Sequence, residues 1–398
     1  MEPDVALSDP DFERRLMTAE VINNVITTER VIEYLKELQD PAPTTGVLHT
    51  RTLKLQQLLA GMGVPTGQFI PRLFGTRSPA ALIDSPKQLW FTAHSDQPTY
   101  IPPVTSDSSF GITPICAHRP RGAGLPYPEW PAIVLRFDPK LQQYTVVSTG
   151  TIGTDEETLK PIYTAATKPK AGFMPGTDRI TYAPKFSIDQ GTGLTHGNMD
   201  NAAGIAASLA AIHALVILAK QRGDPISRID AGWIFPDEEE GLPEDPAFFA
   251  REARRIIHRT PVSWLPGVII DIDGHDTIGD DDPGPYAVYG ATVSGGKGPI
   301  VPADIYTRFD EFLRQLASHG VSVRHTEAIP ASLSRSDDVG LMEVHDQIMS
   351  VGYLIRDPHH NRDIATVHIE GLVHTAKVLA WIAAEMVLEG IAPLQAIV

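Results

Sequence analysis

Apolar residues at helical spacing run through the first part of the chain, over residues 11–38. The pattern predicts one long N-terminal helix that stops before Pro41, because proline does not continue a helix. A second helix is predicted at 51–59, where Gly61 and Gly63 follow the last apolar positions.

Strand and helix patterns then alternate over most of the remaining chain. Short buried strands are predicted at 88–93, 231–235, 267–270 and 321–323, and helices at 202–220, 246–258, 303–318 and 366–388. Strands that alternate with helices form parallel sheets covered on both faces. The pattern therefore predicts an α/β fold with a mostly parallel sheet sandwiched by helices.

Residues 97–191 interrupt this alternation. They are rich in Pro and Gly and contain short alternating runs such as 132–137 and 144–147, which predicts a small all-β insert. A length of 398 residues also favours two domains over one. We expect a discontinuous domain of residues 1–98 and 192–398, with an N-terminal helical extension up to about residue 45, and an inserted domain of residues 99–191.

Composition narrows the possible functions. The formal net charge is −16 and no stretch is rich in Lys and Arg, so nucleic acid and anionic membrane are not expected partners. No membrane span and no secretory signal are predicted, and the expected location is the cytoplasm. Cys116 is the only cysteine, so a metal site would have to use His, Asp and Glu ligands.

Polar residues that suit a metal site follow three predicted strands. Ligands in open α/β sheets lie beyond the carboxyl ends of the strands, so these residues should converge. They are His94 with Asp96, Glu238 with Glu239, and Asp271 with Asp273.

Spacing suggests a role for each member of the first two pairs. His94 and Asp96 project to the same side of an extended backbone, so Asp96 can accept the second N–H of a metal-binding imidazole. Adjacent glutamates suit a ligand and a general base, and we assign Glu239 as the ligand and Glu238 as the base.

Two further positions, Asp200 and His359, complete the candidate set. Asp200 can bridge two ions or cap the helix that follows it. Asp271 is favoured over Asp273 as the ligand from that strand, and His359 comes from a loop before the last helix. His196, His275 and His360 lie near these residues and could replace one of them.

Motifs of several other enzyme classes are missing from the sequence. It contains no HExxH zinc motif, GxSxG nucleophile elbow, P-loop or GxGxxG dinucleotide fingerprint. Chemistry based on two metal ions remains the best-supported interpretation.

Taken in order, five short segments resemble the co-catalytic metallo-aminopeptidases, and most closely the tetrahedral aminopeptidase and glutamyl aminopeptidase family. The resemblance covers roughly residues 89–379 and also includes Ser336-Asp337 and the segments 172–186 and 296–299. The five segments are HSD at 94–96, MDNAAG at 199–204, EEEGL at 238–242, IID at 269–271 and PHH at 358–360.

The resemblance implies a zinc-exopeptidase-like fold with an inserted small β-barrel and a pair of divalent ions, Zn²⁺ with Co²⁺ or Mn²⁺ as alternatives. It implies that one ion is held by His94 and Asp271 and the other by Glu239 and His359, with Asp200 shared. Asp337 is the implied contact for a substrate ammonium group. The expected activity is removal of N-terminal residues from peptides by a homo-oligomer, from dimer to dodecamer.

The chain departs from the family pattern at Gln97, where Glu is usual, and at Ala202, where Arg is usual. These departures leave the oligomer architecture and the substrate preference open, but not the metal site. Two other functions also stay open. One is a related two-metal deacylase or dipeptidase that acts on N-acyl amino acids or dipeptides. The other is a non-catalytic, metal-stabilised assembly protein.

Overall fold

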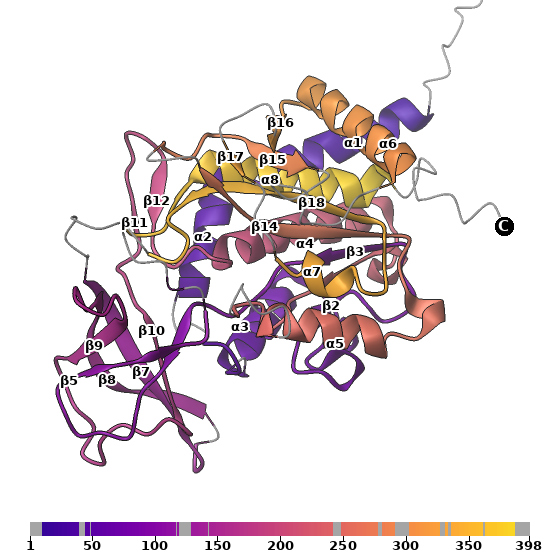
Figure 1. Ribbon diagram of the computed structural model, residues 1–398. Helices are drawn as coiled ribbons and strands as arrows, with labels where there is room; N and C mark the ends of the chain where they lie inside the picture. The colour runs from indigo at the N-terminus through magenta and orange to yellow at the C-terminus, as the bar shows by residue number, and fades with distance from the viewer. Residues whose placement is uncertain are drawn as a thin grey trace, which may run out of the picture.

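The computed structural model contains two separate sheets (Figure 1). One sheet has helices on both faces, and the other belongs to the inserted segment. The residues described are 10–39, 44–47, 49–116, 118, 129–141, 143–241, 248–277, 281–290, 302–326, 331–332, 336–360 and 363–386.

The larger sheet is mixed and has twelve strands. Its centre is parallel, in the order β13 (Ala231–Ile234), β3 (Leu89–Thr92), β14 (Val268–Thr277) and β18 (Ile348–Arg356). The prediction of a mostly parallel sheet is confirmed only for this centre, because the flanking strands are largely antiparallel. These are β1 (Phe69–Ile70), β2 (Ala80–Ala81), β19 (Thr366–His368), β12 (Leu194–His196), β11 (Ser187–Ile188), β15 (Ala287–Gly290), β16 (Val323–His325) and β17 (Ala331–Ser332).

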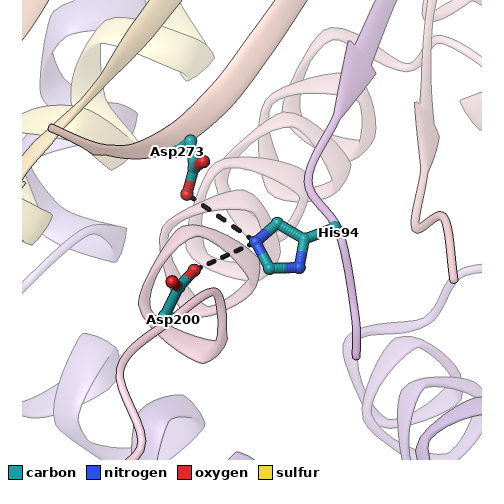
Figure 2. Close-up of side chains that lie close together, drawn as sticks. All are labelled: His94, Asp200 and Asp273. Carbon is teal, nitrogen blue, oxygen red and sulfur yellow. Dashed lines mark hydrogen bonds and ion pairs between the residues drawn. The ribbon is translucent and has the colours of Figure 1, made fainter. Parts of the chain in front are cut away.

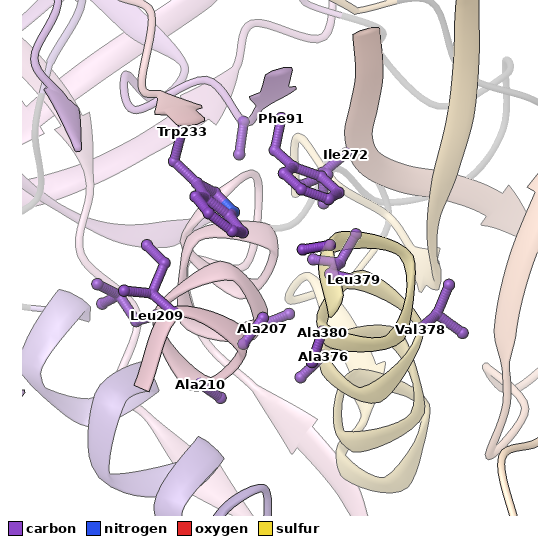
Figure 3. Packing of buried hydrophobic residues seen from close by; sticks show 14 of the residues in the cluster. Phe91, Ala207, Leu209, Ala210, Trp233, Ile272, Ala376, Val378, Leu379 and Ala380 are labelled. Carbon is purple, nitrogen blue, oxygen red and sulfur yellow. The ribbon is translucent and has the colours of Figure 1, made fainter. Parts of the chain in front are cut away.

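Side chains alternate between the two faces of this sheet, and each face has its own core. Phe91 packs with Trp233 on the first face, their rings stacked at 4.6 Å, against helices α4 and α8 (Figure 3). Trp90 packs on the opposite face against α5 and α7. The first core takes in α1 (Pro10–Val25), α2 (Thr28–Gln39), α3 (His49–Met62), α4 (Ala202–Arg222), α6 (Ala303–Gln315) and α8 (Ile369–Trp381), and the second α5 (Arg251–Arg259) and α7 (Asp338–Leu341).

Helix α4 is long and apolar enough to cross a bilayer, but 89% of its most apolar window is buried inside the protein. It packs on α1, α2 and α8, which explains its apolar composition. The helix is therefore accounted for as the central helix of the first core.

Several predicted elements have different bounds. The predicted single N-terminal helix is two helices, α1 and α2, because the helical conformation is interrupted at Ile26 and Thr27. Helix α5 begins only at Arg251, and the C-terminal element starts as strand β19 before it becomes α8. Strand β18 was not predicted at all, although it lies in the centre of the sheet.

The inserted segment forms a seven-stranded antiparallel sheet with its own apolar core. This confirms an all-β insert, while its closure into a barrel and its status as a separate domain stay predictions. Its order is β5 (Ser109–Gly111), β9 (Pro161–Ala165), β8 (Gln143–Thr154), β7 (Trp130–Asp138), β10 (Asp178–Tyr182), β4 (Thr99–Ile101) and β6 (Thr113–Pro114).

Candidate metal and catalytic site

Most candidate residues lie at the carboxyl edge of the four central parallel strands, on the loops after β3, β13 and β18, within β14 and just before α4. Strand β3 ends at Thr92, whose register partner is Asp271 of β14. Asp273 and His94 each lie two residues further along, so they are level with each other. The backbone N–H of Ser95 donates to the carbonyl of Pro236, which holds the loop after β13 at the same level. The convergence expected at the carboxyl edge is thus observed.

His94 is buried at the centre of this edge. Its Nε2 lies 3.0 Å from Asp200 Oδ1 and 3.8 Å from Asp273 Oδ1, so that both carboxylates face the imidazole (Figure 2). Its Nδ1 lies 3.5 Å from Asp96 Oδ1. Asp96 therefore stands behind the imidazole, as the spacing of the two residues predicts.

Asp200 is free to face the site because its neighbour caps the helix. The side chain of Asn201 accepts a hydrogen bond from the N–H of Gly204 at 3.0 Å, and its amide donates to the carbonyl of Ile272 at 2.7 Å. The alternative role of Asp200 as the N-cap thus falls to Asn201. The Asp200–Asn201 peptide bond is cis.

The acidic loop after β13 sends adjacent glutamates in different directions. Glu238 adopts a left-handed conformation (φ 55°), and its carboxylate lies 2.7 Å from Arg255 Nη1 and 3.2 Å from Arg251 Nε. Glu239 Oε2 lies 3.9 Å from His94 Nε2, and Glu240 Oε2 lies 3.5 Å from His359 Nε2. The structure therefore turns the expected base, Glu238, toward arginines, and gives Glu239 and Glu240 to the site.

His359 reaches the site from the loop after β18. Its Nε2 lies 3.4 Å from Asp200 Oδ2, on the carboxylate oxygen that His94 does not contact. Asp200 thus stands between two donor groups that are each compact enough for a metal ion, one with His94 and Asp273 and the other with Glu240 and His359.

Charge supports a cation at this place. Among the described residues, no Lys or Arg pairs with the carboxylates of Asp200, Asp273, Glu239 or Glu240, although all four are largely buried. Buried carboxylates are strongly disfavoured unless they are paired or bind a metal. Oxygen and imidazole ligands without sulfur suit Zn²⁺, Co²⁺ or Mn²⁺.

The pKa values show the same crowding. Burial raises the pKa of Glu239 well above its ordinary value, and the carboxylates of Glu240 and Asp273 add to the effect. Burial also raises the pKa of Glu240, to about 8. Burial acts to raise the pKa of Asp200 as well, but the hydrogen bonds with His359 and His94 outweigh it and lower that pKa.

Asp271 and Asp337 are both buried and belong to neither donor group. One oxygen of Asp271 accepts from the N–H of Asp338 at 3.3 Å, whereas Asp337 accepts from Thr92 Oγ1 at 2.9 Å. Burial raises the pKa of Asp337 to about 7. Asp337 is 0% exposed, and the donor group around His94 contains Asp273 and not Asp271.

The three alternative histidines make other contacts. His196 Nδ1 lies 2.9 Å from Thr366 Oγ1, and His360 Nε2 lies 3.1 Å from Asn198 Oδ1. His275 is buried beside Ser350 on β18. None of the three belongs to the two donor groups.

The short segment 44–47 also contacts the site, although no sequence pattern indicated it. Thr45 Oγ1 donates to Asp96 Oδ2 at 2.8 Å, and the N–H of Gly46 donates to Asp237 Oδ1 at 3.0 Å. The backbone N–H groups of Glu239 and Glu240 also point to Asp96, at 3.2 and 3.3 Å. Asp96 therefore connects His94, the acidic loop and this segment, and no local motif around Thr45 signals the contact.

Neither a family model nor a curated protein matches the sequence. Solved structures do match the fold. An aminopeptidase from the archaeon Desulfurococcus kamchatkensis superposes with a TM-score of 0.68 at 12% identity, over 93% of this chain and 99% of its own. The TET1 peptidase of Pyrococcus horikoshii, which can assemble into a tetrahedron or a large octahedral shell, gives 0.61 at 14% identity, over 89% and 99%.

A Thermotoga maritima protein described as an endoglucanase also shares the fold, with a TM-score of 0.58 at 14% identity over 90% of this chain and 99% of its own. The resemblance to tetrahedral aminopeptidases inferred from the motifs is thus confirmed at the level of the fold.

Proposed function

We propose that this protein is a metal-dependent aminopeptidase that hydrolyses N-terminal residues from peptides. The observation that carries the proposal is the pair of donor groups that share Asp200, His94 with Asp273 and Glu240 with His359. Two divalent ions bound there would supply Lewis-acid polarisation of the scissile carbonyl and a lowered pKa for the attacking water.

Two of the residues that would hold the ions lie one or two positions away from those expected from the sequence. We place Asp273 in the role expected for Asp271, because it is level with His94, and Glu240 in the role expected for Glu239, because it faces His359. His94, Asp200 and His359 keep their expected roles.

Glu239 takes the role of general base that the spacing assigned to Glu238. It is buried beside His94 and belongs to neither donor group, so its carboxylate remains for proton transfer. A raised pKa suits a group that takes a proton from water and returns it to the leaving amine. Asp96 orients His94 through Nδ1 and acts as a positioning residue.

Substitution of the three consecutive glutamates tests these roles. Glu239→Gln should keep both metal ions and lose at least about a hundredfold in kcat, as expected for loss of a general base. Glu240→Gln should lose metal, and Glu238→Gln, which is the matched control, should keep metal and most of the turnover. Metal content is measured by mass spectrometry of the purified protein.

If Glu239→Gln kept full activity while Glu238→Gln bound both metal ions but was inactive, Glu238 would be the general base. If the purified protein held fewer than two ions per chain after incubation with Zn²⁺ or Co²⁺, the proposal of a two-metal site would be wrong.

A substrate panel separates the proposal from the alternatives. Aminoacyl chromogenic amides with a free amine should be hydrolysed, whereas acylated analogues should not. Activity confined to N-acyl substrates or dipeptides would favour the deacylase or dipeptidase. Inactivity of the metal-loaded protein on every substrate would favour an assembly role. Cellulose is included in the panel to test for the endoglucanase activity named for one protein that shares the fold.

We also propose a homo-oligomer, because a protein of this fold assembles into closed shells. Mass photometry should show a species between dimer and dodecamer. A monomer at micromolar concentration would contradict this part of the proposal.

A further inference from the structure

A polar pocket lined in part by Glu238 of the acidic loop lies between α5 and the turn Leu73–Gly75. Its volume is about 270 Å³. It is lined by Arg72, Gly75, Thr76, Arg77, Glu238, Glu252, Arg255 and Arg259. Four arginines against two glutamates leave a net positive charge here, although the whole chain has a formal net charge of −16.

The two glutamates are already engaged. Arg255 Nη1 donates to Glu238 at 2.7 Å and to Glu252 at 2.6 Å. Glu252 also accepts from the backbone N–H of Arg77 at 3.1 Å. One arginine therefore satisfies much of the negative charge in the pocket.

The other arginines keep their charge largely unmatched. The guanidinium group of Arg72 has no hydrogen-bond or ion-pair partner among the described residues, and that of Arg259 donates only to the carbonyl of Gly75, at 3.0 Å. Arg77 Nη1 is 3.9 Å from Glu238 Oε1, which is longer than a hydrogen bond. Three further arginines therefore line the pocket, and the guanidinium group of arginine is a planar fork of N–H donors that suits an oxyanion.

We propose that this pocket binds a compact oxyanion with at least two negative charges, either a phosphate or a small dicarboxylate. The volume lies below the range usual for larger organic ligands, which favours a small anion. Glu238 forms one wall and directly precedes Glu239, so the bound anion contacts the loop that carries the site residues. Binding at this pocket does not depend on the proposed peptidase activity.

Isothermal titration calorimetry of the full, metal-loaded chain tests the site, with inorganic phosphate or succinate titrated at low ionic strength. We expect saturable binding at a single site with Kd below about 1 mM for at least one of the two anions. The anion that binds tells which source of the chemistry the pocket accepts. Arg72→Gln and Arg259→Gln should each weaken it about tenfold or more.

The matched control is Arg228→Gln, on the helical turn Ile226–Arg228, where Arg228 is 73% exposed and pairs with Asp224. It should leave the affinity unchanged. Saturation by neither anion below about 10 mM would overturn the proposal. Binding that both pocket variants retain in full would also overturn it, because the anion would then sit elsewhere, for example on the metal ions.

Discussion

At the scale of single residues, the acidic loop shows how backbone conformation decides chemistry. Three consecutive glutamates, 238–240, point in different directions. Glu238 has a positive φ and its carboxylate faces Arg255, whereas Glu239 faces His94 and Glu240 faces His359. The sequence predicted that this loop would supply a ligand and a base. The direction in which each carboxylate points follows the local backbone, including the left-handed Glu238, which no periodicity encodes.

Asp96 offers a test at the same scale. Asp96→Asn should lower metal affinity about 10- to 100-fold, because the amide is a weaker partner for the imidazole of His94 and disturbs the bonds from Thr45 and the loop. Competition with a chromogenic chelator measures the change. Asp155→Asn, in the turn between β8 and β9, is the control, and equal affinities of the two variants would argue against this positioning role.

At the scale of elements, the carboxyl edge of the central strands brings the candidate metal ligands together. The strand and helix pattern predicted β3, β13, α4 and the beginning of β14, and hence most of the residues that converge. The pattern stopped β14 at Ile270, because two aspartates follow, whereas the strand continues to Thr277 and carries Asp273 to the level of His94. Strand β18 was missed because it mixes Gly352 and polar residues with its apolar ones, so its place was set by neighbouring strands.

Asn201 fixes the start of α4 beside Asp200. Asn201→Ala removes the cap and the bonds to Ile272 and Tyr353, so we expect a loss of about 1–3 kcal/mol in the free energy of unfolding. Urea unfolding followed by circular dichroism measures it. The exposed Asn24 of α1 supplies the control, and Asn24→Ala should change stability by less than about 0.5 kcal/mol. Similar losses for both variants would contradict the role of the cap.

The stacked pair Phe91 and Trp233 anchors α4 and α8 to the sheet (Figure 3). Trp233→Ala should lower the free energy of unfolding by about 3–5 kcal/mol, because it leaves a cavity in a closely packed core. The same unfolding experiment with Leu16→Ala, a residue that is 59% exposed, should show little change. A loss below about 1 kcal/mol for Trp233→Ala would mean that the core collapses around the cavity.

At the scale of the whole molecule, the metal ions should stabilise the fold. The candidate ligands come from five distant segments, and without cations their buried carboxylates repel one another. At a free metal concentration about 100 times Kd, binding to the folded state alone contributes about 2.7 kcal/mol.

Removal of metal with a chelator should therefore lower the midpoint of thermal unfolding, and Zn²⁺ should restore it. Scanning calorimetry measures both steps. Glu240→Gln should respond much less to the chelator than the unsubstituted protein does. An unchanged midpoint after complete metal removal would show that the carboxylates do not need cations for stability.

The order of the site residues along the chain also has a consequence for biosynthesis. Among the candidate ligands, His94 leaves the ribosome first and His359 last. His359 follows β18, and this strand must insert between β14 and β19. At synthesis rates of about 5–20 residues per second, the intervening segment takes roughly tens of seconds to emerge. A nascent chain would hold only part of the ligand set during that interval, so metal loading is expected to be a late maturation step that follows completion of the sheet.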